Sequence, residues 1–349
     1  MTAPIYTPQL AYRQIGALVG GGLHGDRVFD THDRGNRDNI HAPFIALQEA
    51  LRRYGLDLHT PDVLARQGLR PDFEIHLNAR RRVPHPRSYA LLFETPHIRP
   101  LNAKLAHLAR YRKVFTWRPE WVDGQRFVPL AFPNPIALPE VDGLAGRDRM
   151  VCMIAGNKTM THDDGRGLYT ERLRTIKWFE QHQSQAFDLY GPGWGQPARR
   201  STWSGRAARA WQTLLLRWHG QAAFPNWRGL AASKLEVMRR TRFAICYENV
   251  RDFPGYITEK IFDCLFAGCV PIYWGPQNIA EHVPAACFID RRAYASHEAL
   301  FDALCAISES EYRARQQAMY EFLASEQAQV YSAIYFGDQV AAVIRNDMN

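Results

Sequence analysis

Long apolar runs are missing from this sequence. Nowhere in its 349 residues do uninterrupted apolar residues reach the length of about 18 that is typical of a membrane-spanning helix. The first 27 residues lack a basic segment, and Gln14 and several glycines interrupt their apolar stretch, so we expect neither a signal peptide nor an anchor there. A protein that is soluble, or peripheral to a membrane, is the prediction.

Cysteine is scarce, and its spacing excludes the usual metal and redox motifs. The six cysteines form no CxxC pair and no Cys/His cluster, and each lies in an apolar run. We therefore expect reduced, buried thiols in a cytosolic protein at Cys152, Cys246, Cys264, Cys269, Cys287 and Cys305. The sequence also lacks internal repeats and low-complexity tracts, which excludes a solenoid.

What the sequence does contain is positive charge on an otherwise ordinary folded composition. It has 46% hydrophobic and 22% charged residues, with a net charge of +8 and a pI near 9.2. A basic protein suits an acidic ligand or surface, and nucleotide sugars, nucleic acids and anionic membranes all fit that description. The length allows two domains.

Short apolar segments alternate with helical periodicity, which predicts Rossmann-like domains with parallel sheets. In the first half we expect strands at 17–19, 27–30, 56–58, 73–77, 88–93 and 113–117, and helices at 41–54 and 101–110. A segment rich in Pro, Gly and charge, 132–149, is the expected linker. Beyond it we expect strands at 150–155, 187–190, 243–247, 270–274 and 287–290, and helices at 169–181, 259–267 and 300–323.

The most informative stretch is 243–275. An apolar strand there ends abruptly in polar residues, and a helix that begins after Thr258, as N-cap, leads to the next apolar strand. Ligands of such open sheets bind beyond the carboxyl ends of the strands, where these polar residues fall. Lys260 is unusual because it places a cation at the positive end of a helix dipole; a bound anion such as a diphosphate would remove that conflict.

The segment YENVRDFPGYITEKIFDCLFAGCVPIYWG closely resembles the most characteristic region of the family 10 glycosyltransferases, the α1,3/4-fucosyltransferases. The resemblance implies a GT-B fold, in which two Rossmann-like domains face each other across a cleft. It also implies GDP-fucose as donor and transfer with inversion. The corresponding domains are an acceptor domain at 1–145, a donor domain at 146–310 and, at 311–349, a helix expected to pack back on the first domain.

Inverting transfer needs a general base, and Glu94 is our candidate. It follows an apolar strand and precedes a proline, as the catalytic glutamate of the family does, although the family usually has G-E-N-x-x-P where this chain has F-E-T-P. Apolar surroundings can raise the pKa of such a carboxyl toward working pH. Glu120 and His97 are alternatives in the same region.

For the leaving diphosphate we combine Lys260 with Arg172, which opens a helix similar to the family's Arg-containing helix. The resemblance adds contacts to the nucleotide or sugar at Glu248, Asn249, Tyr256, Thr258 and Glu259. No cofactor or bound metal is predicted, and a divalent ion is expected at most to stimulate. Asp163 and Asp164 lack the D-x-D form and are interpreted as turn residues.

Segment 201–219 combines tryptophan, leucine and arginine. Its simplest interpretation is an amphipathic helix packed on the second domain with basic residues outward. A second interpretation is an interfacial helix on anionic lipid, where a lipid-linked acceptor would be found. Nucleic-acid binding is a third, but no known RNA or DNA module accompanies the segment, and no nucleic-acid partner is predicted.

The function implied by the resemblance is fucose transfer from GDP-fucose to a glycan hydroxyl in α1,3 or α1,4 linkage. The expected acceptor is GlcNAc or glucose of an oligosaccharide, glycolipid or lipopolysaccharide. Golgi relatives carry an N-terminal anchor, so the sequence suggests a bacterial, cytoplasmic enzyme, peripheral at most to the inner membrane face. The alternatives are a GT-B transferase for another GDP-sugar, and a non-catalytic membrane- or nucleic-acid-binding protein on the same scaffold.

Overall fold

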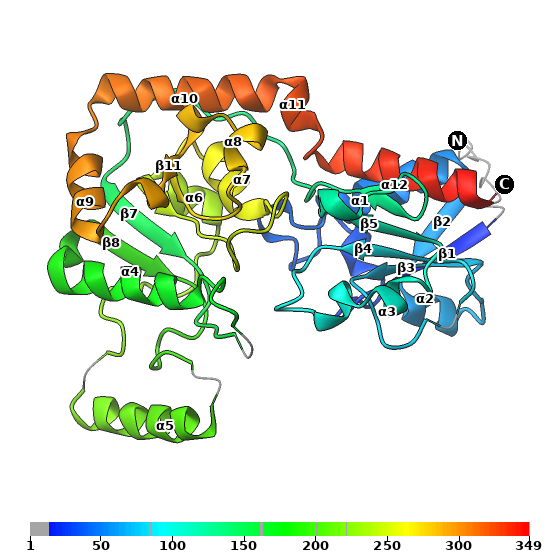
Figure 1. Cartoon of the computed structure of the whole chain (residues 1–349), viewed down its shortest axis with the longest axis horizontal. Coiled ribbons are helices and arrows are strands. Elements are labelled where there is room, and N and C mark those ends of the chain that lie inside the picture. Colours follow the sequence, from blue (N-terminus) through cyan, green and yellow to red (C-terminus); the bar gives the residue numbers. More distant parts are fainter. Residues whose placement is uncertain (1–13, 84, 161–162, 200–201, 221, 349) are drawn as a thin grey trace, which may run out of the picture.

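The computed structural model describes residues 14–348 except 84, 161–162, 200–201 and 221. Two sheets lie side by side, and every strand pairing within them is parallel (Figure 1). The first sheet has the order β2-β1-β3-β4-β5-β6. Its strands are β1 Gln14–Val19, β2 Leu56–His59, β3 Phe73–Leu77, β4 Ser88–Leu92, β5 Lys113–Thr116 and β6 Phe127–Pro129.

The second sheet has the order β11-β10-β9-β7-β8. Its strands are β7 Arg149–Ile154, β8 Phe187–Tyr190, β9 Thr241–Ile245, β10 Val270–Tyr273 and β11 Ile289–Asp290. All predicted strands of this half exist, with ends that differ by a few residues. The predicted linker, 132–149, connects the two sheets without forming a helix and includes the first residue of β7.

Helices cover both sheets. The α-helices are α1 Ala42–Arg53, α2 Pro61–Arg66, α3 Leu105–Leu108, α4 Tyr169–His182, α5 Trp203–Trp218, α6 Lys234–Arg239, α7 Glu259–Phe266, α8 Ile279–His282, α9 His297–Ala306, α10 Glu309–Ala324, α11 Glu326–Gln329 and α12 Ala333–Met348. Short 3₁₀ helices are η1 Arg27–Phe29, η2 Arg37–Asn39, η3 Pro100–Ala103, η4 Pro119–Trp121, η5 Ser184–Ala186, η6 Ala285–Cys287 and η7 Arg291–Ala293.

The central strands are buried on both faces, as their unbroken apolar sequences predict. Every residue of β4 and of β10 is buried. Each domain has its own large apolar core, one around β1, β3 and β4 and one around β7, β9 and β10. Rigid strands therefore fix the positions at which the chain leaves the carboxyl edge of each sheet.

Helix α12 crosses from the second domain and packs on α1 of the first (Figure 1). Phe336, Val340 and Ile344 are buried in the same core as Leu47 of α1. At the crossing, a Cβ on Gly337 would lie 2.6 Å from the carbonyl oxygen of Ala46, so only glycine allows the two backbones to approach this closely. The first domain is thus completed by a distant part of the chain.

Four local predictions were wrong. Segment 27–30 is not a strand, because Asp26 adopts φ +57° and the 3₁₀ helix η1 follows it. The helix expected at 101–110 divides into η3 and α3, and the one at 300–323 divides into α9 and α10. Ser308 starts α10 with a capping box that also involves Glu311. Cys305 is exposed rather than buried, whereas the other five cysteines are buried.

The preferred interpretation of 201–219 was also wrong. Helix α5 forms, but it projects away from the second sheet and its covering helices (Figure 1). The side that faces the protein carries Gly205, Arg209 and Thr213, whereas Trp203 and Trp218 are 86% and 84% exposed. The apolar face therefore points outward. In the part of the chain that the structure describes, no helix is long and apolar enough to cross a membrane.

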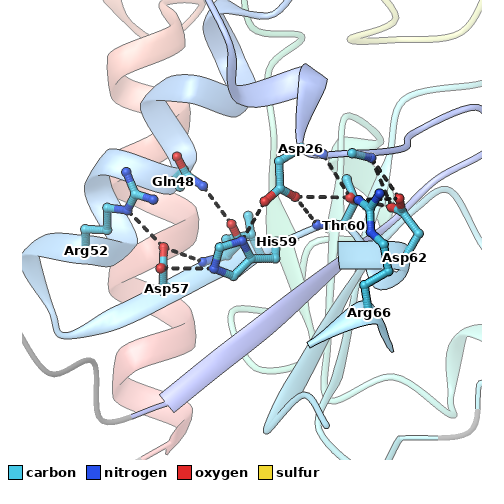
Figure 2. A network of polar contacts seen from close by, with 10 residues as sticks. Asp26, Gln48, Arg52, Asp57, His59, Thr60, Asp62 and Arg66 are labelled. Carbon is cyan, nitrogen blue, oxygen red and sulfur yellow. Dashed lines mark hydrogen bonds and ion pairs between the residues drawn. The ribbon is translucent and has the colours of Figure 1, made fainter. Parts of the chain in front are cut away.

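A polar network ties the segment after β1 to the end of β2. Figure 2 shows His59 between two carboxylates, with its Nδ1 2.6 Å from Asp26 and its Nε2 3.1 Å from Asp57. The backbone N–H and the hydroxyl of Thr60 both donate to Asp26, and the backbone N–H of Gly25 donates to Asp62. This network fixes the start of the loop that carries residues 37–40 toward the second domain.

Candidate active site

A cavity of about 470 Å³ lies where the carboxyl edges of the two sheets approach each other. Both domains supply its walls. The first contributes Arg37, Asp38, Ile40, Phe93, Glu94 and Phe132, and the second contributes, among others, Lys158, Arg172, Asn249, Tyr256, Thr258, Glu259 and Lys260. Of the eight predicted site residues, seven line this single cavity and one, Glu248, does not.

Glu94 leaves the carboxyl end of β4 and is held by its backbone. Asn78, at φ +64°, accepts hydrogen bonds from the backbone N–H of Phe93 and of Glu94, at 3.0 and 2.9 Å. The side chain of Asn102 donates to the carbonyl of Glu94 at 2.7 Å and also to Asn78. The position of the glutamate is thus fixed without using its carboxylate.

The carboxylate itself has an unused, buried oxygen. Oε2 of Glu94 has no hydrogen-bond partner within the described residues. Burial raises the pKa of Glu94, and the negative charge of Glu259 adds to the effect, although Lys260 and Lys158 oppose it. A buried acceptor with no protein partner and a raised pKa is suited to receive a proton from a bound hydroxyl.

Glu248 lies behind the cavity wall and is fully buried. Its carboxylate accepts hydrogen bonds from the backbone N–H of Thr258 at 2.9 Å, from the Thr258 hydroxyl at 2.8 Å and from Tyr273 at 3.2 Å. It also forms an ion pair of 3.2 Å with Lys260. The predicted ligand contact of Glu248 is therefore corrected: the residue supports Lys260. Thr258 occupies the N-cap position, but its hydroxyl bonds to Glu248 instead of capping α7.

Acidic neighbours keep Lys260 charged. Burial alone would lower its pKa, but the carboxylates of Glu248 and Glu259 raise it above its usual range. Burial also acts against the charged form of Glu259, yet Lys260 and Lys234 lower the pKa of Glu259 to about 2. The first turn of α7 therefore presents one fixed ammonium and one fixed carboxylate to the cavity.

Arg172, Asn249 and Tyr256 form the adjoining wall. Arg172 is buried and donates to the carbonyl of Tyr247 at 2.6 Å and to the side chain of Asn249 at 3.2 Å. The amide of Asn249 lies 3.4 Å from the hydroxyl of Tyr256. Burial lowers the pKa of Arg172 from its usual value, and no carboxylate bonds directly to its guanidinium in the described structure. The group keeps donor capacity for an anion.

Comparisons with known proteins agree with this geometry. Residues 209–325 match the family described as glycosyltransferase family 10 (fucosyltransferase) C-term. The matched segment covers about a third of this chain and includes β9, α7 and β10. Among curated proteins, the Helicobacter pylori alpha-(1,3)-fucosyltransferase FucT is 31% identical over 70 residues, which is 20% of this chain and 14% of that protein. An Arabidopsis thaliana alpha-(1,4)-fucosyltransferase is 36% identical over 64 residues, or 18% and 16%.

Solved structures show the fold. An alpha1,3-fucosyltransferase with GDP matches with a TM-score of 0.51 and 13% identity, over 96% of this chain and 91% of that one. An alpha-glucosyltransferase in complex with UDP and DNA matches with a TM-score of 0.55 and 10% identity, over 95% and 99%. The chain has the GT-B fold. The curated relatives, by contrast, are matched over less than a fifth of their own lengths.

The loop before α7 also joins the two domains. A Cβ on Gly255, which has φ +78°, would lie 2.3 Å from the carbonyl oxygen of Trp117 in the first domain. The rings of Trp117 and Tyr256 are 4.9 Å apart, and His97 pairs with Asp164 at 2.9 Å. One wall of the site is therefore continuous across the domain boundary.

The alternative bases lie elsewhere. Glu120 pairs with Arg118 at the surface, and His97 takes part in the interdomain pair; neither lines the cavity. Asp163 accepts from the backbone N–H of Gly165 and Gly167, in the way expected of a turn residue. Within the described residues, no group of three His, Cys, Asp or Glu side chains is arranged to hold a metal.

Five charged residues that line the cavity were not predicted from the sequence: Arg37, Asp38, Lys158, Lys234 and Asp263. Lys158 follows β7, and the rule that selects residues beyond a strand's carboxyl end would have found it. Arg37 and Asp38 come from a polar loop with no such signal. Asp38 accepts from the hydroxyl of Ser233 at 2.9 Å and from the backbone N–H of Lys234 at 3.1 Å, at the start of α6.

Proposed function

We propose that this chain transfers fucose from GDP-fucose to a hydroxyl of an acceptor glycan, with inversion at the anomeric carbon. The observation that carries the proposal is the buried, unpartnered oxygen of Glu94 in the same cavity as Lys260 and Arg172. The family of the C-terminal domain, whose described members are fucosyltransferases, supports fucose as the sugar.

In the proposed reaction, the acceptor hydroxyl gives its proton to Glu94 as its oxygen attacks fucosyl C1. The bond from C1 to the diphosphate oxygen breaks, and its electron pair leaves with GDP. Lys260 and Arg172 offset the negative charge that develops on the diphosphate, from positions already fixed by Glu248 and by the Tyr247 carbonyl. Glu259 and Asn249 are the proposed hydrogen-bond partners of the nucleotide or the sugar.

The finer assignments are part of this proposal. We place the linkage as α1,3 or α1,4, on GlcNAc or glucose of an oligosaccharide, glycolipid or lipopolysaccharide, with the enzyme working in the cytoplasm. The Helicobacter pylori and Arabidopsis relatives, with those two linkages in their names, support this choice. We also propose that no metal is required, because the cavity supplies its own fixed cations.

The test is a thermal-shift panel of GDP, GDP-fucose, GDP-mannose, UDP-sugars and CMP-sugars, run in EDTA. A ligand at one hundred times its dissociation constant stabilises a fold by about 2.7 kcal/mol, which is a shift of a few degrees for a chain of this size. We expect a response to GDP and GDP-fucose. A response to UDP-sugars alone would contradict fucose transfer, and silence throughout would favour a non-catalytic protein.

Transfer itself is measured with GDP-fucose and a panel of GlcNAc- and glucose-terminated oligosaccharides. We expect a fucosylated product with the α configuration, which NMR of the product identifies from the anomeric coupling. Product of the β configuration would contradict the inverting mechanism while leaving the donor assignment intact.

A further inference from the structure

The outward face of α5 is an exposed apolar surface that the proposed function does not use. On this one helix, the exposed fractions are 86% for Trp203, 61% for Trp211, 56% for Leu214, 40% for Leu215 and 84% for Trp218. At 100° per residue these five side chains share one side of the helix. A soluble surface seldom gathers so many large apolar side chains without a partner.

The charges around this face have one sign. Between Asp188 and Glu236 the sequence contains no Asp or Glu, although arginines recur throughout the segment. Arg206 and Arg217 are exposed and lie along one edge of the apolar face. Tryptophan and arginine thus occupy separate sides of α5, as a helix in a lipid interface requires, rather than interleaving along a groove for nucleic acid.

The helix is fixed to the protein at its base. Arg209 donates to the carbonyl of Pro197 at 2.8 Å and to the side chain of Gln196 at 2.6 Å. The buried amide of Asn157 donates to the carbonyl of Gly193 at 2.9 Å and accepts from the backbone N–H of Arg199 at 3.0 Å. Arg209, on the inner side of α5, is therefore bonded to the protein, whereas the side that carries the tryptophans is exposed.

The segment that carries α5 begins and ends at the cavity. The chain enters this segment from Gly191 and Pro192 and leaves it toward Leu230 and Ala231, and all four residues line the cavity. Leu230 is itself 63% exposed. The chain therefore links a surface bound by α5 directly to two walls of the cavity.

We infer that α5 is a docking helix for an anionic lipid surface, with its tryptophans in the interface and its arginines on the headgroups. Its 16 residues and its arginines suit a helix that lies in the plane of the interface. Lipid binding does not depend on the donor chemistry. Only its consequence, delivery of a lipid-linked acceptor to the cavity, rests on the proposed function.

The test is flotation of the whole protein with vesicles of phosphatidylcholine and phosphatidylglycerol in equal parts, compared with phosphatidylcholine alone. We expect binding to the mixed vesicles, weakened by high salt, and a blue shift of tryptophan fluorescence. The double variant Trp203→Ser/Trp218→Ser should lose about tenfold or more in partitioning, and Arg206→Gln/Arg217→Gln should lose the preference for anionic vesicles.

The matched control is Ile334→Ser, which removes a 70% exposed apolar side chain from α12 on the other domain. It should bind vesicles as the unaltered protein does. Circular dichroism and the GDP-induced thermal shift check that every variant folds and keeps its donor site.

Three outcomes would overturn the inference: no binding to the mixed vesicles, equal binding by the double tryptophan variant, or a dimer in light scattering that this variant abolishes while vesicles remain unbound. The last would identify a second copy of the chain as the partner. Failure here, with transfer to a soluble acceptor intact, leaves the proposed function standing. Vesicle binding without any sugar transfer contradicts only the proposed function.

Discussion

Glu94 and Glu248 occupy equivalent places in the two domains, and their environments are opposite. Each follows a buried strand at the carboxyl edge of its sheet. Glu248 has its carboxylate bonded to Thr258, Tyr273 and Lys260, whereas Glu94 has its backbone bonded and a carboxylate oxygen left without a partner.

This comparison shows that the role of a carboxylate at a strand end depends on which groups fill its hydrogen-bond acceptor sites. A carboxylate whose acceptor sites are filled by the protein holds neighbouring groups in place, and one whose sites are empty is available to a substrate. Both residues were selected by the same sequence rule, their position beyond the carboxyl end of a strand. Only the hydrogen bonds in the structure distinguish Glu248, which supports Lys260, from Glu94, the candidate base.

Replacing the candidate base should have the largest effect. Glu94→Gln keeps the shape but cannot accept a proton, so we expect kcat to fall roughly 100- to 10,000-fold. Stability should be unchanged or higher, because the substitution removes a buried negative charge. Initial rates with GDP-fucose and chemical denaturation measure the two effects, and calorimetric titration with GDP checks that the variant still binds the nucleotide.

The control for this substitution is Glu120→Gln, which alters an exposed carboxylate in the same domain. It should leave kcat within about twofold. If Glu94→Gln retained full activity with normal GDP binding, Glu94 would not be the general base, and its contrast with Glu248 would not concern catalysis.

Replacing Glu248 should mainly lower stability, whereas replacing Glu94 should mainly lower kcat. Glu248→Gln removes one partner of a buried ion pair, and we expect the free energy of unfolding to fall by about 3 kcal/mol. Chemical denaturation measures it. A loss of kcat as large as that of Glu94→Gln, without loss of stability, would mean that Glu248 acts directly on the substrate.

The pH dependence of kcat/KM should report the ionisation of the Glu94 carboxyl. Because burial raises its pKa, the carboxyl stays protonated above the pH at which an ordinary glutamate ionises. As a base it must be ionised, so kcat/KM should rise with pH through an apparent pKa above 4.5.

The contribution of Glu94 to stability should fall as pH rises, whereas kcat/KM should rise. A carboxyl with a raised folded pKa favours the folded state below its unfolded pKa, and this contribution is lost as pH rises through the folded pKa. Glu94→Gln should remove both the acidic limb of the rate profile and this loss of stability. An acidic limb that persists in the variant would assign it to another group, such as Asp263, whose pKa burial raises to about 6 despite the opposing Lys234.

The smallest expected effect comes from removing one donor from Glu248. Tyr273→Phe keeps the buried ring and deletes a hydrogen bond of 3.2 Å, so we expect a loss of about 1 kcal/mol in the free energy of unfolding. Tyr312→Phe is the matched control, because Tyr312 is equally buried and its hydroxyl donates to a backbone carbonyl. Only the first substitution should also alter kcat, through Lys260.

Much of the fold could be predicted because the buried strands are short, unbroken apolar runs. The segment at 27–30 failed, since Val28 and Phe29 are apolar but Asp26 turns the chain just before them. The break between α9 and α10 had a local signal, Ser308 followed by Glu311, that helical periodicity concealed. Local sequence thus predicts elements better than it predicts the turns that end them.

The site was predictable where its residues follow strands and unpredictable where distant loops supply them. Lys260, Asn249 and Glu94 are found in this way, whereas Arg37 reaches the cavity only through tertiary contacts. The orientation of α5 failed for a related reason. Periodicity identifies an apolar face, but whether that face packs on the protein depends on residues that lie far away in the sequence.

The crossing of α12 onto α1 has a consequence for the way the protein is made. Residues 42–53 emerge from the ribosome nearly 300 residues before residues 333–348, so at about 5 to 20 residues per second the interval is on the order of tens of seconds. During that time the apolar surface around Leu47 and Leu51 lacks the side chains that later cover it. The domain synthesised first is therefore the one completed last.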